Sequence, residues 1–167
     1  DHGPDVLVPE SDTAARSAWN RSLVKAGIAY VASRVMVMAG AAVVASQRVV
    51  DANVDGLPRP EAATGLIVDV LSSWDGAFYL ELVRRGYPSA IPADVTYVEP
   101  DARAAFFPLY PMIVDAADRL LPGGSVIAGL AVNFVLGTVA VYLVGLIARS
   151  IFDAKAAERS MILMALF

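Results

Sequence analysis

The chain of 167 residues is more apolar and less charged than an ordinary soluble domain. Hydrophobic residues make up 57% of it and charged residues 18%, whereas soluble domains contain about 45–50% and about 25%. The formal net charge of −4 argues against nucleic acid as a partner, because nucleic-acid-binding domains are basic. The absence of cysteine excludes disulfides and thiolate-bound metals. This composition favours a membrane protein.

The first long apolar segment covers residues 23–48, after a polar tail at 1–22 that we expect to be cytoplasmic. Its central 21 residues carry Arg34 as their single charge, and a helix of this length crosses a hydrocarbon core of about 30 Å. A cleaved signal sequence is the alternative, but its apolar part is usually only about 7–15 residues long. The segment therefore predicts transmembrane helix 1. Because a charge inside a span is costly, Arg34 is expected to face protein or a polar cavity.

Residues 49–124 predict a loop that contains short helices. Asp75 is a favourable residue for a helix N-terminus, and Gly86 is a favourable residue just after a helix end. Prolines near residue 109 suit the first turn of another helix, where the missing N–H is tolerated. Three short helices are therefore expected, at residues 62–71, 76–85 and 109–121.

The segment 125–148 contains no charged residue over 24 positions. This length and composition predict transmembrane helix 2. A basic connector at 149–159 follows, and residues 160–167 form an apolar run too short to cross a bilayer. We therefore expect 160–167 to begin transmembrane helix 3, and the chain to be the N-terminal part of a larger polytopic protein. A function that needs the later helices is then absent, and this part alone is expected to be inactive as an enzyme. Mostly small residues recur along the second span at multiples of four, which predicts a close helix-packing surface: Ser125, Gly129, Asn133, Gly137 and Gly145.

The distribution of lysine and arginine predicts the orientation of the chain. Basic residues are dense before the first span and in the 149–159 connector, whereas the long loop holds only five of them. Since the basic side of a membrane protein faces the cytoplasm, the tail and the connector are expected inside. The 49–124 loop is then extracytoplasmic.

Asp75 is the candidate catalytic residue of this loop. On a helix that starts there, Asp75, Phe78 and Tyr79 share one face. A carboxylate beside aromatic rings suits sugar chemistry, because the rings offer stacking surfaces and the carboxylate can accept a hydroxyl proton. The alternative from the residues alone is a plain helix cap, and spacing by itself favours that alternative.

Two roles are open for Arg85. Glu81 precedes it by four residues, which predicts an ordinary surface ion pair worth a few tenths of a kcal/mol. Alternatively, Arg84 and Arg85 contact a lipid phosphate at the membrane surface.

Two motifs occur in order within the loop. The first contains Trp74-Asp75-Gly76, Tyr79-Leu80 and Gly86-Tyr87, and the second is Ala105-Phe106-Phe107-Pro108-Leu109-Tyr110-Pro111. Together they resemble the first extracytoplasmic loop of the PIG-V-type mannosyltransferases, which belong to the GT-C superfamily of integral-membrane glycosyltransferases. Ser33-Arg34 is also similar to the opening helix of that family. The resemblance covers roughly residues 23–167.

The resemblance implies an all-α integral membrane protein, the N-terminal fragment of a GT-C-type transmembrane bundle with a helical extracytoplasmic loop. It implies transfer of mannose from a polyprenyl-phosphate-mannose donor with inversion, with Asp75 as general base. An alanine-rich composition with more arginine than lysine adds the expectation of a bacterial plasma membrane. The substrate-binding candidates are Trp74, Tyr79, Arg34, Arg85, Phe107 and Tyr110.

The sequence leaves the acceptor open between a glycan, a glycolipid and a protein. No metal site is visible, although acidic residues near Asp75 could recruit a divalent ion. Two other functions stay open. One is a non-catalytic membrane anchor or assembly subunit, in which Asp75 only caps a helix. The other is a GT-C enzyme that uses a different lipid-linked sugar.

Overall fold

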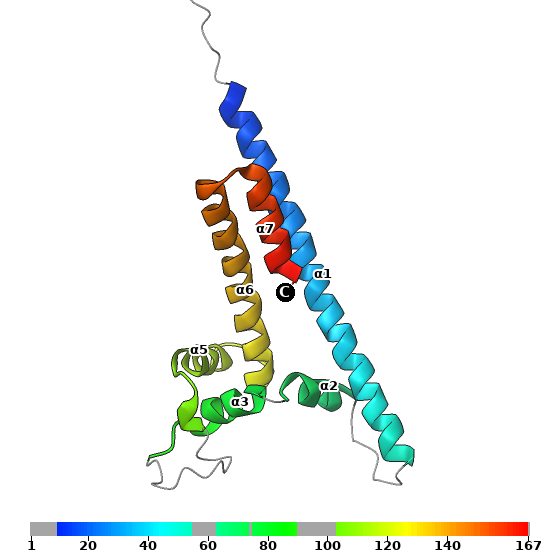
Figure 1. Cartoon of the computed structure of the whole chain (residues 1–167). Helices are drawn as coiled ribbons and strands as arrows, with labels where there is room; N and C mark the ends of the chain where they lie inside the picture. The colour runs from blue at the N-terminus through cyan, green and yellow to red at the C-terminus, as the bar shows by residue number, and fades with distance from the viewer. Residues whose placement is uncertain (1–9, 55–62, 74, 90–102, 167) are drawn as a thin grey trace, which may run out of the picture. The chain divides into compact units, whose positions relative to one another are not determined.

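The computed structural model describes residues 10–54, 63–73, 75–89 and 103–166 (Figure 1). Within these ranges every regular element is a helix, as the predicted all-α fold requires. The chain divides into two compact units. Unit 1 contains Asp1–Val35 and Leu136–Phe167, and unit 2 contains Met36–Val135.

Helix α1 runs without interruption over Glu10–Val54, a length of 45 residues. It extends beyond the predicted span of 23–48 at both ends, and part of the predicted tail is therefore helical. The physical reason is the absence of a breaker, since no proline lies between Pro9 and Pro58. At 1.5 Å per residue the helix is about 68 Å long, more than twice the thickness of a hydrocarbon core.

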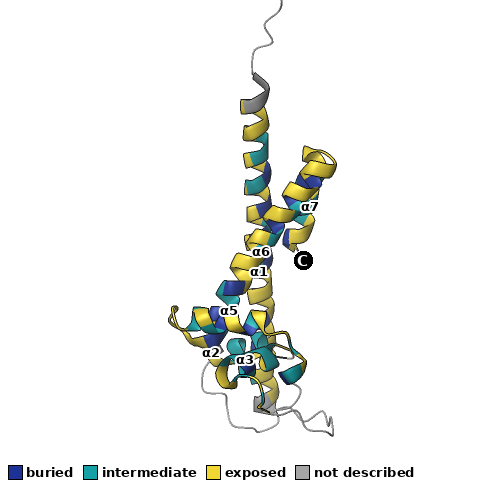
Figure 2. Cartoon of the chain, turned by 90° about the vertical axis from the view of Figure 1, so that its left-hand side faces the viewer, coloured by how far each residue is buried: buried dark blue, intermediate teal, exposed yellow. Residues whose placement is uncertain are grey.

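Helix α6 covers Gly124–Ile151 and includes the whole of the predicted second span. It begins directly after Gly123, whose φ of 113° is an easy conformation only for glycine. Both α1 and α6 are long and apolar enough to cross a membrane. Only 22% and 17% of their most apolar stretches are buried, and Figure 2 shows exposed residues along much of α1. A core helix of a soluble protein would be mostly covered.

The short helices of unit 2 lie close to their predicted positions. Helix α3 ends before Gly86, whose φ is 71°, and this confirms the predicted helix end. Helix α5 stops earlier than predicted, because Leu120 and Leu121 both donate their N–H groups to Ala117 and a proline follows them. The elements are α2 (Ala63–Leu71), α3 (Asp75–Arg85), the 3₁₀-helix η1 (Arg103–Ala105) and α5 (Leu109–Asp118).

Helix α7 covers Ala154–Leu166 and starts inside the predicted 149–159 connector. The backbone N–H of Ala156 donates to Asp153 Oδ1 at 2.7 Å, so Asp153 supplies an N-terminal cap that the connector prediction overlooked. Helix α7 returns alongside α1, where the Ser33 hydroxyl donates to the carbonyl of Ala165 at 2.7 Å. The third apolar segment is therefore a helix that starts six residues earlier than expected.

The small-residue stripe of α6 is a packing surface, as predicted. In unit 1, Gly137 lies against the Tyr30 ring of α1, and Gly145 lies against the Met161 side chain of α7. A side chain at either glycine would displace its neighbour. The buried core of this unit is formed by Ala26, Tyr30, Val141, Met161 and Ala165.

Unit 2 has its own small core, which holds α3, α5 and the first turns of α6 together. Val114 of α5 is 1% exposed and packs with Ala128 and Val132 of α6. Val83 of α3 and Tyr110 of α5 pack against this cluster. The same three helices form the walls of the cavity described next.

Candidate functional site

A cavity of about 410 Å³ opens within unit 2, between the end of α2, helix α3, helix α5 and the first turns of α6. Its volume falls in the usual range of small-molecule sites. Its lining combines aliphatic side chains with a few polar groups, which is typical of such sites. It is lined by Leu71, Ser72, Asp75, Gly76, Tyr79, Leu80, Val83, Tyr110, Val114, Val126, Gly129, Leu130 and Asn133.

Asp75 lines this cavity as the first residue of α3. A carboxylate is favourable at this position, because it meets the positive end of the helix dipole. The Ser72 hydroxyl donates backwards to the Val68 carbonyl at 2.8 Å, so Ser72 and Asp75 do not form a capping box. The Asp75 carboxylate is exposed, and it makes no hydrogen bond or ion pair within the described part of the chain. It is therefore accessible to a ligand in the cavity.

Aromatic rings form one wall of the cavity. Tyr79 and Tyr110 meet edge to face with their ring centroids 5.0 Å apart. Phe106 supports this wall, because it stacks on Phe78 at 5.2 Å and meets the edge of Tyr79 at 4.9 Å. Such contacts are favoured by the quadrupoles of the rings, and they hold the rings in fixed orientations.

Tyr110 and Asn133 add neutral hydrogen-bonding groups to the same wall. Burial raises the pKa of Tyr110 above its ordinary value, and the nearby Tyr79 acts in the same direction. The hydrogen bond with the Asn133 side chain opposes that rise in the pKa. The phenol is therefore protonated at neutral pH, and it can donate as well as accept a hydrogen bond.

Asn133 lines the cavity, although the sequence pattern did not predict it as a site residue. Its place in the stripe of small residues assigned it to helix packing alone. A separate signal was present, because Asn133 is the single amide side chain among the 24 uncharged residues of the predicted span. A polar side chain inside an apolar span is costly unless it has a partner, and this makes it a marker of function.

The charge of the cavity comes from one residue. Among the described residues that line it, Asp75 carries the only carboxylate, and no lysine, arginine or histidine is present. Hydroxyl groups and cations are therefore favoured ligands for this lining, and a phosphate would be repelled by the carboxylate.

The other predicted site residues lie elsewhere. Arg85 forms the predicted ion pair with Glu81 at 2.9 Å, and its side chain is 72% exposed outside the cavity. Phe107 is 84% exposed and does not line the cavity. Trp74 lies outside the described residues. The structure therefore brings together Asp75, Tyr79 and Tyr110 of the predicted set.

Arg34 belongs to unit 1. Its guanidinium lies over the Tyr30 ring, 4.9 Å from the centroid, and its Nε donates to the Ser33 hydroxyl at 3.2 Å. Both partners belong to α1 itself, so the prediction that Arg34 faces protein or a polar cavity stays a prediction. The cation–π geometry offsets part of the cost of removing the charge from water.

No group of three or more histidine, aspartate or glutamate side chains that could hold a metal occurs among the described residues. No family model, curated protein or solved structure matches this chain. Over its described residues the protein is all-helical. Two of its helices are long and apolar enough to cross a membrane. Its candidate site is a partly aromatic cavity with one accessible carboxylate.

Proposed function

We propose that this protein is an integral membrane glycosyltransferase of a bacterial plasma membrane. It transfers mannose from polyprenyl-phosphate mannose to a hydroxyl group of an extracytoplasmic glycan, glycolipid or protein. The observation that carries the proposal is the position of Asp75, an accessible carboxylate in a 410 Å³ cavity beside the rings of Tyr79 and Tyr110.

In the proposed reaction Asp75 accepts the proton of the acceptor hydroxyl. The acceptor oxygen forms a bond to the anomeric carbon of mannose while the bond from that carbon to the phosphate oxygen breaks. Polyprenyl phosphate leaves with the bonding electron pair, and the configuration at the anomeric carbon is inverted. A single general base is sufficient for this transfer, because phosphate is already a good leaving group.

The other residues of the cavity lining suit a substrate in which a sugar is linked to a lipid. The Tyr79 and Tyr110 rings offer surfaces on which the apolar face of a sugar can stack, and Asn133 can bond to sugar hydroxyls. Val126 and Leu130 come from the first turns of α6, one of the two helices apolar enough to cross a membrane. They would place the hydrocarbon part of a lipid-linked substrate against an apolar wall.

The test is the substitution Asp75→Asn, which keeps the shape of the side chain and removes its basicity. Membranes from cells that express the full-length protein are given polyprenyl-phosphate mannose with a labelled sugar, and transferred label is measured over time. We expect the rate to fall by about 10²- to 10⁴-fold, the usual contribution of a general base.

The matched control is Asp69→Asn. Asp69 is exposed on α2 and does not line the cavity, so its substitution should leave the rate unchanged. Equal rates for wild type and Asp75→Asn would contradict the catalytic role of Asp75. Absence of transfer by the wild type would favour the anchor or assembly function, and activity with another lipid-linked sugar would correct the donor.

A further inference from the structure

Exposed basic side chains gather at one end of unit 1. Here the early part of α1 lies beside the end of α6 and the beginning of α7, as the contacts of Lys25 with Glu158 and of Arg149 with Trp19 show. We call this surface the basic end. It consists of Arg16, Arg21, Lys25, Arg149, Lys155 and Arg159.

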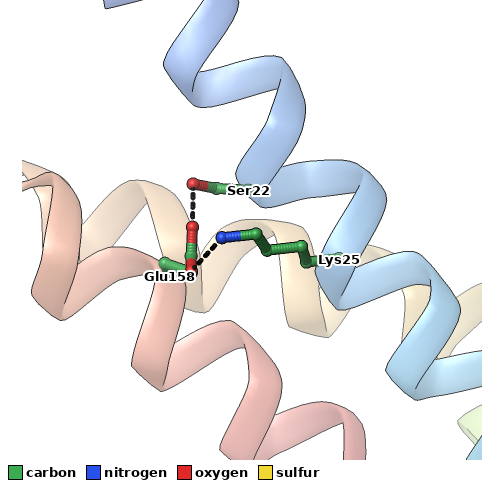
Figure 3. Close-up of polar contacts among 3 residues, drawn as sticks. All are labelled: Ser22, Lys25 and Glu158. Atoms are coloured by element: carbon green, nitrogen blue, oxygen red, sulfur yellow. Dashed lines mark hydrogen bonds and ion pairs between the residues drawn. The ribbon is translucent and has the colours of Figure 1, made fainter.

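The two carboxylates described at the basic end already have partners. Asp153 accepts the N–H of Ala156 at 2.7 Å and caps α7. Glu158 accepts hydrogen bonds from Lys25 Nζ at 2.7 Å and from the Ser22 hydroxyl at 2.6 Å (Figure 3). Since Lys25 is neutralised by Glu158, the positive charge that remains comes from the other five cations.

None of those five pairs with a carboxylate among the described side chains. Arg149 lies over the Trp19 ring, 4.9 Å from its centroid, and Arg21 donates to the Ser17 hydroxyl at 3.3 Å. Lys155 and Arg159 are four residues apart and lie on one side of α7. Their charges are free to meet an external anion.

The surface next to the basic end is apolar. Ile28 of α1 is 65% exposed and Ile147 of α6 is 58% exposed, within the two helices that could cross a membrane. Trp19 lies at this boundary and packs against Tyr142 of α6 with ring centroids 6.4 Å apart. Tryptophan and tyrosine are enriched where a membrane meets water. Cations next to exposed apolar side chains fit an amphiphile with an anionic head better than a soluble anion.

We propose that the basic end binds the headgroups of anionic phospholipids. The phosphates lie at Arg21, Lys155 and Arg159, while the acyl chains lie along the exposed apolar side chains of α1 and α6. Clusters of four to eight basic residues beside a membrane-spanning helix recognise anionic lipids in this way. The proposal concerns unit 1 alone and does not depend on sugar transfer.

The test uses the fluorescence of Trp19 as a local probe. A Trp74→Phe background leaves Trp19 as the single tryptophan. The protein is reconstituted in phosphatidylcholine vesicles that contain a minor fraction of dibrominated phosphatidylglycerol or of dibrominated phosphatidylcholine. Bromine quenches tryptophan on contact, so stronger quenching by the anionic lipid measures its preference for this surface. We expect that preference, and we expect it to decrease at high salt.

Three substitutions remove the charge that the proposal invokes, namely Arg21→Gln, Lys155→Gln and Arg159→Gln together. Each cation near a charged surface contributes about a fivefold change in association, so we expect the preference for phosphatidylglycerol to be lost. Quenching by phosphatidylcholine should persist, which shows that the variant is still inserted.

The matched control removes three arginines of unit 2 by Arg48→Gln, Arg84→Gln and Arg119→Gln. This control should keep the preference, because net charge changes equally but the basic end is intact. Equal quenching of the Trp74→Phe protein by both lipids would overturn the proposal. Equal loss of preference in both triple variants would overturn it too, since general charge would then explain the effect.

Discussion

At the scale of a single residue, Asn133 of α6 has two roles, in helix packing and in the lining of the cavity. Its position in the stripe of small residues places it on the face of α6 that packs against other helices, and its side chain bonds to Tyr110 in the cavity wall. A packing stripe and a polar lining are therefore not alternatives in this helix. The amide fixes the phenol that would meet a ligand hydroxyl.

Substitution of Asn133 by leucine should raise the pKa of Tyr110 further. The hydrogen bond from Asn133 lowers that pKa, whereas burial raises it, so removal of the bond leaves burial unopposed. The pKa can be followed by ultraviolet absorption of tyrosinate in wild type and Asn133→Leu, with Tyr110→Phe to identify the signal. An unchanged pKa of Tyr110 would show that the bond does not form in solution.

Gly137 is the residue at which a single methyl group should be most costly in unit 1. A β-carbon there would overlap the Tyr30 ring, so Gly137→Ala should lower the free energy of unfolding by about 1–3 kcal/mol. Gly27→Ala is the control, because no atom lies within 4 Å of its added carbon and alanine favours a helix by about 0.5–1 kcal/mol. Thermal unfolding in detergent micelles measures both. Equal stabilities of the two variants would contradict the close packing at Tyr30.

At the scale of the helix, the end of α3 was predictable, because Gly86 follows it and a positive φ suits glycine there. A second glycine with positive φ, Gly123, lies directly before the start of α6. The start of α7 and the extent of α1 were not predicted. The length of an apolar segment indicates which part of a helix can lie in a membrane. It does not indicate how far the same helix continues through the polar residues on either side.

The cavity could be predicted only in part, for a related reason. Spacing along α3 places Asp75 and Tyr79 on one face, and the structure puts both in the lining. The neighbours of that face come from α5 and α6, and periodicity within one helix says nothing about them. Phe106 and Phe107 illustrate this, since Phe106 packs on Tyr79 while Phe107 is exposed.

The link between α1 and α7 should depend on pH. The hydrogen bonds from Lys25 and Ser22 hold the pKa of Glu158 below its ordinary value of 4.5. Because the pKa is lowered on folding, the stability that this contact adds is present above pH 4.5 and is lost as pH falls through the lowered pKa. We expect a higher Tm for wild type than for Glu158→Gln at neutral pH, and a gap that closes on acidification.

The control for this contact is Glu81→Gln. Its partner Arg85 lies on the same helix, so the substitution removes a surface pair worth about 0.3–0.5 kcal/mol and no link between helices. A gap between wild type and Glu158→Gln that persists at acidic pH would show that the charge of Glu158 does not stabilise the fold.

At the scale of the whole molecule, charge divides the two units. Unit 1 has its exposed cations at the basic end, whereas the cavity of unit 2 has a single carboxylate and no cation among its described lining. The first surface favours anionic lipid and the second favours a hydroxyl-bearing ligand. The phosphate of a lipid-linked donor would therefore need groups other than these lining side chains.

Arg34 has a further consequence in the proposed membrane arrangement, where α1 lies across an electrical potential. Moving one charge through 100 mV changes its energy by about 2.3 kcal/mol, so a shift of α1 by one turn in a 30 Å core would gain or lose only about 0.4 kcal/mol. A hydrogen bond such as that from Ser33 to Ala165 contributes about 0.5–1.5 kcal/mol. Together with the Tyr30–Gly137 contact, it outweighs the electrical work. In that arrangement these contacts would hold Arg34 at a constant depth in the field.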